Sequence, residues 1–96
     1  MVILDGSGFS IAEEWSFEEA MANLLVDYRQ ADEALGPLKY ALSHNPLAFP
    51  KAHSDVRIAK IEKRKLDELP AFRVFFRISE EPKTVYLLHV DHGQLE

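Results

Sequence analysis

An alternation of apolar and polar side chains in the second half of the chain predicts β-strands. In residues 71–78, Phe72, Val74 and Phe76 fall on one face of an extended segment. The other face of that segment carries Arg73, Phe75 and Arg77. This pattern is typical of a strand with one face in the core and the other in contact with water.

Two other segments have strand character. Residues 84–90, TVYLLHV, are rich in β-forming residues and almost continuously apolar, which predicts an interior strand. Residues 56–61 alternate, with Val56, Ile58 and Lys60 on one face and Arg57, Ala59 and Ile61 on the other. Residues 63–70 form a charged loop in this interpretation, and residues 79–83 form a turn between two strands.

The first half of the chain predicts one short strand and two helices. Residues 8–14 fit a strand, and Ser16 with Glu19 fits a capping box that would begin a helix. Apolar residues then recur at helical spacing up to Leu35, and Gly36-Pro37 is expected to separate this helix from a second one. Asn45-Pro46 is expected to end the second helix, because proline disfavours helical backbone at the residue before it.

The resulting order is β-α-α-β-β-β within a single domain of residues 1–96. Short connections make the last three strands an antiparallel meander, and the two helices fold back on each other as a hairpin covering one face. The predicted class is therefore α+β, with a helical hairpin packed on a small, mainly antiparallel sheet.

The amino-acid composition excludes several classes of function but does not identify one. The 96-residue chain has a net charge of −5 and no cysteine, which excludes thiolate chemistry and disulfides. No apolar run is long enough for a membrane span, and the first residues lack the pattern of a secretion signal, so a cytoplasmic location is expected. Residues 56–77 nevertheless hold seven bases and three acids, and could form a local basic face or simply a solvated surface.

The histidines do not form a recognisable metal-binding motif. Strand alternation places His89 and Asp91 on one face and His92 on the other, which is poor geometry for joint ligation. No glycine-rich phosphate-binding loop is present either, so neither a metal nor an organic cofactor is predicted. A histidine remains the side chain best suited to proton transfer at neutral pH.

The sharpest chemical feature is the pair of guanidinium groups on one face of residues 71–78. Arg73 and Arg77 flank Phe75, and two guanidiniums beside an aromatic ring suit phosphate contacts and base stacking. By simple alternation, Tyr86 and His89 have opposite parity, so only one of them is expected to share this face. The alternative is that the arginines are the solvated face of a half-exposed sheet, with Phe75 packed beneath their stems.

The stretch AFRVFFRISEEPKTVYLLHVDH, residues 71–92, resembles the closing hairpin of the RelE/ParE toxin superfamily. Members of that superfamily commonly carry aromatic-Arg pairs in one strand, an acidic turn and a hydrophobic final strand. The resemblance implies a small toxin that is neutralised by a cognate antitoxin protein. RelE-like members cleave mRNA on the ribosome without a metal, using the 2′-hydroxyl as nucleophile, whereas ParE-like members act on DNA gyrase.

On the RelE-like interpretation, basic residues of the sheet orient the RNA and stabilise charge at the scissile phosphate. Arg73 matches the superfamily's sheet arginine. The expected catalytic residues are Arg73, Arg77, His89 and His92. The expected RNA-binding residues are Arg57, Lys60, Lys63, Arg64, Lys65 and Tyr86. The ribosome and mRNA would be partners besides the antitoxin, and the sequence predicts no oligomeric state.

Three departures from the superfamily pattern keep other functions open. His92-Gly93 stands where many members have a basic pair, and the chain is acidic where active toxins of this kind are usually basic. The C-terminal segment that carries a catalytic tyrosine in some RelE-like members has no counterpart in the residues up to Glu96. One alternative is a non-catalytic module that binds a partner peptide through its helical hairpin or a sheet edge. Another is a ParE-like gyrase inhibitor that performs no chemistry of its own.

Overall fold

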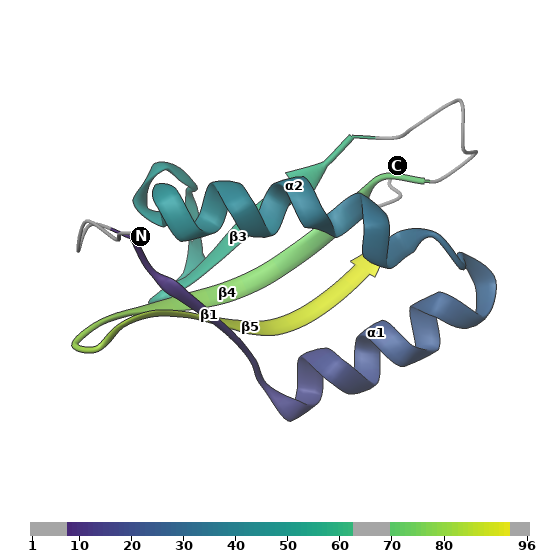
Figure 1. Ribbon diagram of the computed structural model, residues 1–96, viewed down its shortest axis with the longest axis horizontal. Coiled ribbons are helices and arrows are strands. Elements are labelled where there is room, and N and C mark those ends of the chain that lie inside the picture. The colour runs from purple at the N-terminus through teal and green to yellow at the C-terminus, as the bar shows by residue number, and fades with distance from the viewer. Residues whose placement is uncertain (1–7, 63–69, 93–96) are drawn as a thin grey trace, which may run out of the picture.

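The computed structural model describes residues 8–62 and 70–92, which fold into one five-stranded sheet and two helices (Figure 1). The elements are β1 (Ser10–Glu13), α1 (Trp15–Asp27), α2 (Ala31–His44), the short 3-10 helix η1 (Pro46–Ala48), β2 (Lys51–His53), β3 (Val56–Ile61), β4 (Phe72–Glu80) and β5 (Lys83–His92). The α+β class, the helical hairpin and the antiparallel meander are confirmed. The basic loop residues Lys63, Arg64 and Lys65 lie outside the described residues.

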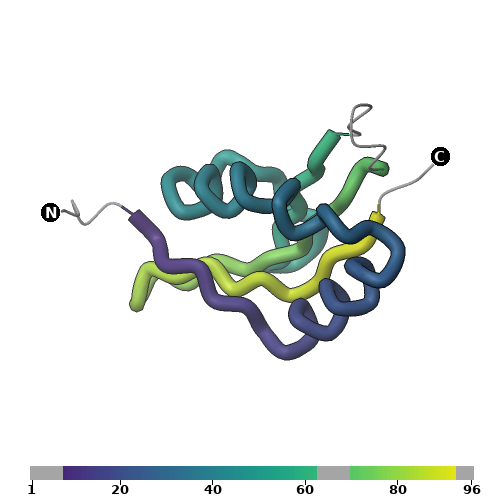
Figure 2. The backbone as a smooth tube through the Cα atoms, turned by 45° about the vertical axis from the view of Figure 1, so that its right-hand side comes forward, coloured from purple at the N-terminus to yellow at the C-terminus, as the bar shows by residue number. Residues whose placement is uncertain are grey.

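The sheet has the strand order β1, β5, β4, β3, β2. The meander from β2 to β5 is antiparallel, and only β1 is parallel to its neighbour, with Ser10 opposite Thr84 and Glu13 opposite Leu87. Figure 2 shows β1 running beside β5, with both helices on the same side of the sheet. The nearly continuous apolar sequence of β5 is explained by its position between two strands.

The core lies between the helices and one face of the sheet, which we call the inner face. Phe72, Val74 and Phe76 of β4 point into it and are at most 1% exposed. The helices and the other strands contribute the remaining buried apolar side chains: Phe17, Leu24, Ala31, Ala34, Leu35, Leu42, Ala59, Val85, Leu87 and Val90. Burial of these side chains is the main source of stability, because transfer of apolar surface from water is favourable. No helix of the described residues covers the opposite face of the sheet.

The boundary between the helices differs from the sequence prediction. The helical hairpin turns at residues 28–30, whereas Gly36 and Pro37 lie inside α2. Tyr28 leaves the helical conformation at φ −131° and ψ 84°, and its ring packs edge-on against Phe72 at 6.1 Å. An interior proline costs a helix about 3 kcal/mol. Pro37 has no N–H to donate to the Glu33 carbonyl four residues earlier, but Glu33, Gly36 and Pro37 are all exposed, so water can bind that carbonyl. Burial of the neighbouring apolar residues Ala34 and Leu35 offsets the cost of the proline. The predicted helix end at Asn45-Pro46 is confirmed.

The predicted capping box is wrong, and Ser16 has a different role. Helix α1 begins at Trp15 with Glu14 as its N-cap, two residues before the predicted cap, and has no side-chain cap. The Ser16 hydroxyl instead donates a hydrogen bond to the Leu88 carbonyl of β5 at 2.5 Å. The adjacent Leu87 carbonyl accepts from the backbone N–H of Glu14 at 3.0 Å. Glu14 and Ser16, at the start of α1, thus bind the edge of β5 just beyond Glu13, the last residue of β1 that pairs with it.

Replacing Ser16 by alanine is therefore expected to lower the free energy of unfolding by about 1 kcal/mol, the usual net value of one hydrogen bond. A urea titration followed by circular dichroism measures this difference. Ser10→Ala is the matched control, because the Ser10 hydroxyl has no hydrogen-bond partner within the described residues. Equal stability of the two variants would show that the contact to Leu88 does not stabilise the fold.

Strand β2 was not expected from the sequence. It pairs with β3 through a two-residue turn, Ser54-Asp55, in which Ser54 adopts a positive φ of 50°. Such turns usually carry glycine or asparagine, so the Ser-Asp pair was a weak signal. No helix in the described part of the chain is long and apolar enough to span a membrane.

Candidate RNA-binding face of the sheet

The uncovered side of strands β3, β4 and β5, which we call the outer face, gathers most of the candidate residues that the structure describes. Strand pairing places Lys60 opposite Arg73, Arg73 opposite Asp91, Phe75 opposite His89, and Arg77 opposite Tyr86. Lys60, Arg73 and Arg77 outnumber the single acid, Asp91, on this part of the sheet. A protein that is acidic overall therefore presents a locally basic surface here.

An irregularity in β5 corrects the prediction that Tyr86 and His89 lie on opposite faces. Phe75 is opposite His89 and Phe76 is opposite Leu87, so Leu88 is an extra residue in a β-bulge. The extra residue resets the alternation, and both Tyr86 and His89 lie on the outer face. The Leu88 carbonyl at the bulge is the group that Ser16 binds, so α1 stabilises the irregularity that brings these two rings together.

Arg73 and Asp91 form a two-pronged ion pair across the β4–β5 ladder. The Arg73 Nε donates to Asp91 Oδ1 at 2.9 Å, and Nη2 donates to Oδ2 at 3.0 Å. This hydrogen bonding and the charge of Asp91 raise the pKa of Arg73 above its ordinary value. His89 Nε2 lies 3.6 Å from Asp91 Oδ2, so the same carboxylate is close to two candidate residues.

Arg77 differs from Arg73 because it has no carboxylate partner in the part of the chain that the structure describes. Its guanidinium carbon lies 4.8 Å from the centre of the Tyr86 ring, a distance typical of cation–π contacts. Phe75 lies between the two arginines, with the Arg73 guanidinium carbon 5.6 Å from its ring centre. The Phe75 and His89 rings are 6.0 Å apart, so aromatic and basic groups are interleaved along the face.

Arg57 does not join this group. It is opposite Phe76 in the β3–β4 ladder and therefore lies on the inner face. Its guanidinium Nη1 donates to the backbone carbonyl of Phe49 at 2.6 Å, which ties β3 to the segment after η1. The two basic residues predicted for the same strand are thus separated, with Lys60 outside and Arg57 on the helix side.

Replacing Arg57 by glutamine is accordingly expected to lower the free energy of unfolding by about 1 kcal/mol through loss of the bond to Phe49. The RNA affinity of folded Arg57→Gln is expected to equal that of Arg29→Gln, a control that removes one positive charge at an exposed position away from the outer face. Urea unfolding and fluorescence anisotropy with labelled RNA provide the two readouts. If Arg57→Gln loses much more RNA affinity than Arg29→Gln, Arg57 contributes directly to RNA binding.

His92 is also separated from the other candidates. It is opposite the buried Phe72, and its ring lies 5.7 Å from that of Tyr28 in an edge-on contact on the helix side. His89 and His92 therefore face opposite ways, as alternation predicted for this end of the strand. Within residues 8–62 and 70–92, no three histidine, aspartate or glutamate side chains gather closely enough to hold a metal ion.

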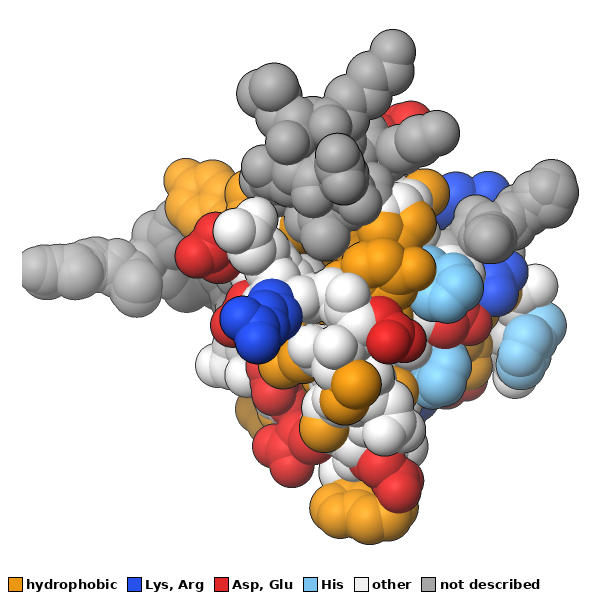
Figure 3. All heavy atoms as spheres, turned by 90° about the vertical axis from the view of Figure 1, so that its right-hand side faces the viewer, with side chains coloured by type: hydrophobic (Ala, Val, Ile, Leu, Met, Phe, Trp, Pro, Cys, Tyr) orange, Lys and Arg blue, Asp and Glu red, His pale blue; other side chains and the backbone are white. Residues whose placement is uncertain are grey.

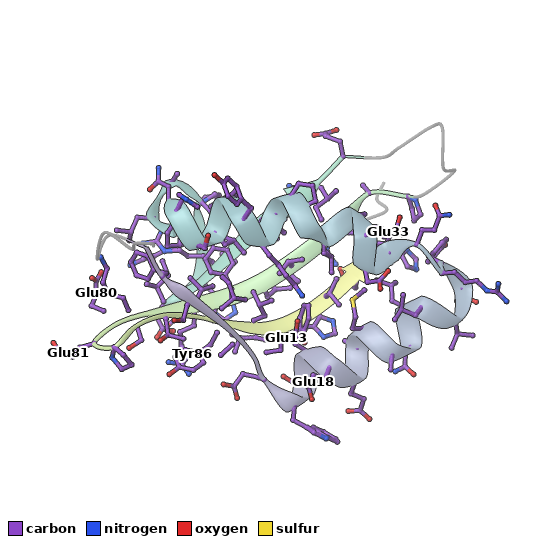
Figure 4. All side chains as sticks on the ribbon, viewed as in Figure 1. Glu13, Glu18, Glu33, Glu80, Glu81 and Tyr86 are labelled. Atoms are coloured by element: carbon purple, nitrogen blue, oxygen red, sulfur yellow. The ribbon has the colours of Figure 1, made fainter. Side chains whose placement is uncertain are left out.

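The space-filling view from one end shows how charged and histidine side chains are distributed over one surface of the molecule (Figure 3). Histidine side chains and part of the lysine and arginine side chains gather toward its right-hand edge, with acidic side chains among them and over much of the rest, and another basic side chain lies left of the centre. Figure 4 shows Glu80 and Glu81 at the tip of the β4–β5 hairpin and Tyr86 farther along the sheet. The acidic turn is therefore at the end of the basic face and not within it.

This arrangement can bind a polyanion that carries flat groups. Lys60 and Arg77 supply positive charge for phosphates, while Phe75 and Tyr86 supply ring surfaces on which bases can stack. His89 is 51% exposed on the same face and can exchange a proton with a bound ligand. The face is the side of the sheet opposite the helices, and an open sheet surface suits an extended strand better than a small molecule.

Comparison with solved structures agrees with this architecture. The chain is similar to a chain of the toxin–antitoxin complex RelBE2 from Mycobacterium tuberculosis, with a TM-score of 0.65. The match covers 88% of this chain and 98% of that chain, at 20% sequence identity. The resemblance inferred from residues 71–92 is confirmed for the fold. No family model and no curated protein sequence matches the chain.

Proposed function

We propose that this chain is the toxin of a toxin–antitoxin pair and that it inhibits translation by cleaving mRNA on the ribosome. The observation that carries the proposal is the outer face, where Arg77 over Tyr86, Phe75 and Lys60 form an open, basic and aromatic surface. The similar solved chain comes from a toxin–antitoxin complex, which supports the toxin assignment and an antitoxin partner.

Each group on the outer face has a role in this proposal. Lys60 and Arg77 neutralise phosphates on either side of the scissile bond, and Tyr86 and Phe75 hold bases by stacking. His89 accepts the proton of the RNA 2′-hydroxyl as its oxygen attacks the adjacent phosphorus. The bond to the 5′-oxygen breaks, that oxygen takes a proton from water, and His89 returns its own proton to the hydroxide that remains. The products are a 2′,3′-cyclic phosphate and a 5′-hydroxyl end, with no metal or redox partner required.

The proposal is tested by inducing the chain in bacteria without an antitoxin and pulse-labelling protein and DNA synthesis separately. We expect protein synthesis to stop first and new 5′-hydroxyl ends to appear within mRNA coding regions. An earlier stop in DNA synthesis would favour a gyrase inhibitor instead. If neither changes while folded protein accumulates, the chain is a binding module and the proposal is wrong.

A His89→Gln variant separates the chemical step from binding. It keeps a polar side chain on the outer face but removes the proton acceptor, so new mRNA ends should be lost while the variant remains bound to ribosomes. Sedimentation of ribosomes from induced cells measures the bound fraction. Unchanged cleavage by the folded variant would exclude His89 from proton transfer.

A further inference from the structure

Arg73, the arginine that best matches the superfamily pattern, is already occupied by an anion of the same chain. We propose that Asp91 is an internal competitor, which holds Arg73 in the free protein and has to be displaced before Arg73 can contact an RNA phosphate. Asp91 would therefore weaken RNA binding at the outer face. The inference rests on the proposed function for its RNA ligand, but the competition itself is a property of the two side chains.

The geometry of the pair is that of a guanidinium bound to a two-oxygen anion. Nε and Nη2 of Arg73 are on one edge of the guanidinium plane, and each donates to a different oxygen of Asp91. A phosphate would use the same edge and the same two donors, because carboxylate and phosphate both accept such paired hydrogen bonds. Asp91 and a phosphate therefore exclude each other at this edge.

The pair is exposed enough to open. The side chains of Arg73 and Asp91 are 42% and 35% exposed, and ion pairs in such positions contribute little net stability because water competes for both charges. Asp91 also has a second neighbour, His89, at 3.6 Å from its Oδ2. A displaced Asp91 can remain beside that histidine while Arg73 turns to a phosphate.

Arg77 provides the internal contrast. It lies on the same strand and face, but its neighbour is the Tyr86 ring at 4.8 Å and not an acid. Competition of this kind therefore acts at one arginine of the face and spares the other. Replacing Asp91 should change the contribution of Arg73 without changing that of Arg77.

The test compares Asp91→Asn with Glu19→Gln, an exposed site on α1 at which the same unit of negative charge is removed. Fluorescence anisotropy with a labelled single-stranded RNA of about 12 nucleotides measures affinity. Asp91→Asn is expected to bind RNA about fivefold more tightly than Glu19→Gln. This factor corresponds to the free energy of a strong ion pair among solvent-exposed ones, which RNA binding no longer has to break in the variant. Adding Arg73→Gln to Asp91→Asn should abolish the gain.

Equal affinities for Asp91→Asn and Glu19→Gln would overturn the inference, because the effect would then be one of overall charge alone. Weaker binding by Asp91→Asn would also overturn it, since Asp91 would then orient Arg73 for the ligand. Circular dichroism confirms that each variant is folded.

A second measurement does not depend on RNA. The Nε–H signal of Arg73 is followed by NMR while inorganic pyrophosphate is added to the parent and to Asp91→Asn. The variant should respond at lower pyrophosphate concentration than the parent, and an identical response would overturn the inference. If the variant responds earlier but neither protein binds RNA, the competition stands and the RNA-cleaving function fails.

Discussion

Truncation of Phe76 to alanine is expected to lower the free energy of unfolding by about 3–5 kcal/mol. Phe76 is 0% exposed in the middle of β4, opposite Leu87, and its ring packs edge-on against Phe49 at 5.9 Å. The loss combines the transfer free energy of the ring with the cavity left in a close-packed core. A domain of this size has a total stability of about 5–15 kcal/mol, so the variant would keep only part of it.

The neighbouring residue supplies the control. Phe75 has the same side chain on the same strand but lies on the outer face and is half-buried. Phe75→Ala should cost about 1 kcal/mol, because less of its ring is removed from water. Urea unfolding of both variants measures the difference, and Phe76→Leu with Phe75→Leu replaces them if Phe76→Ala does not fold. Equal losses at the two positions would contradict the assignment of inner and outer faces.

Replacement of Arg77 by alanine is expected to have the largest effect on RNA binding. Arg77 has no competing carboxylate among the described residues and is held over Tyr86, so its charge is available to a phosphate. Loss of one phosphate contact should weaken RNA binding about tenfold at low salt and reduce the slope of log affinity against log salt by about 0.7. The fold should be unaffected, because the Arg77 side chain lies on the uncovered side of the sheet and not in the core.

Arg29→Ala is the matched control for this effect. Arg29 is an exposed arginine in the turn between α1 and α2, so the variant loses the same charge away from the outer face. Binding isotherms at several salt concentrations give both the affinity and the slope, and growth after induction gives the effect in cells. An equal decrease for Arg29→Ala and Arg77→Ala would mean that RNA senses overall charge and not this surface.

The two arginines of β4 should differ in a way that sequence spacing does not indicate. Arg73 and Arg77 are four residues apart, share one face and each lie near an aromatic ring. Only Arg73 is opposite an aspartate in the ladder. Arg73→Ala is therefore expected to weaken RNA binding less than Arg77→Ala, because Arg73 has to leave Asp91 before it can bind a phosphate.

Acidic charge on the helical side is compatible with RNA binding at the sheet. Glu18, Asp32 and Glu33 lie in the first turns of α1 and α2, where the helix dipoles favour negative charge. Lys39 of α2 pairs with Glu13 of β1 at 2.6 Å, so part of this acidic charge is used to hold the helices on the sheet. The negative net charge of the chain therefore reflects the acidic residues of the helical layer more than the charge of the outer face.

The sequence by itself determined the class of the fold and the composition of the two sheet faces. Alternation in 71–78 and 56–61 is local, since successive side chains of a strand point to opposite sides, and it correctly separated Phe72, Val74 and Phe76 from Arg73, Phe75 and Arg77. Lys60 and Arg57 were separated by the same rule. Helix termini were less well predicted, because the turn at Tyr28 depends on packing against Phe72 and His92.

Only the tertiary structure decided which candidate residues meet. The bulge at Leu88 places Tyr86 and His89 on one face, and it is stabilised by Ser16, which is 72 positions away in the sequence. Likewise, the pairing of Arg73 with Asp91 follows from the β4–β5 register. These features depend on hydrogen bonds and strand pairing between distant segments. Local periodicity determines only which side of its own strand a residue occupies, and a β-bulge inverts that alternation for the residues beyond it.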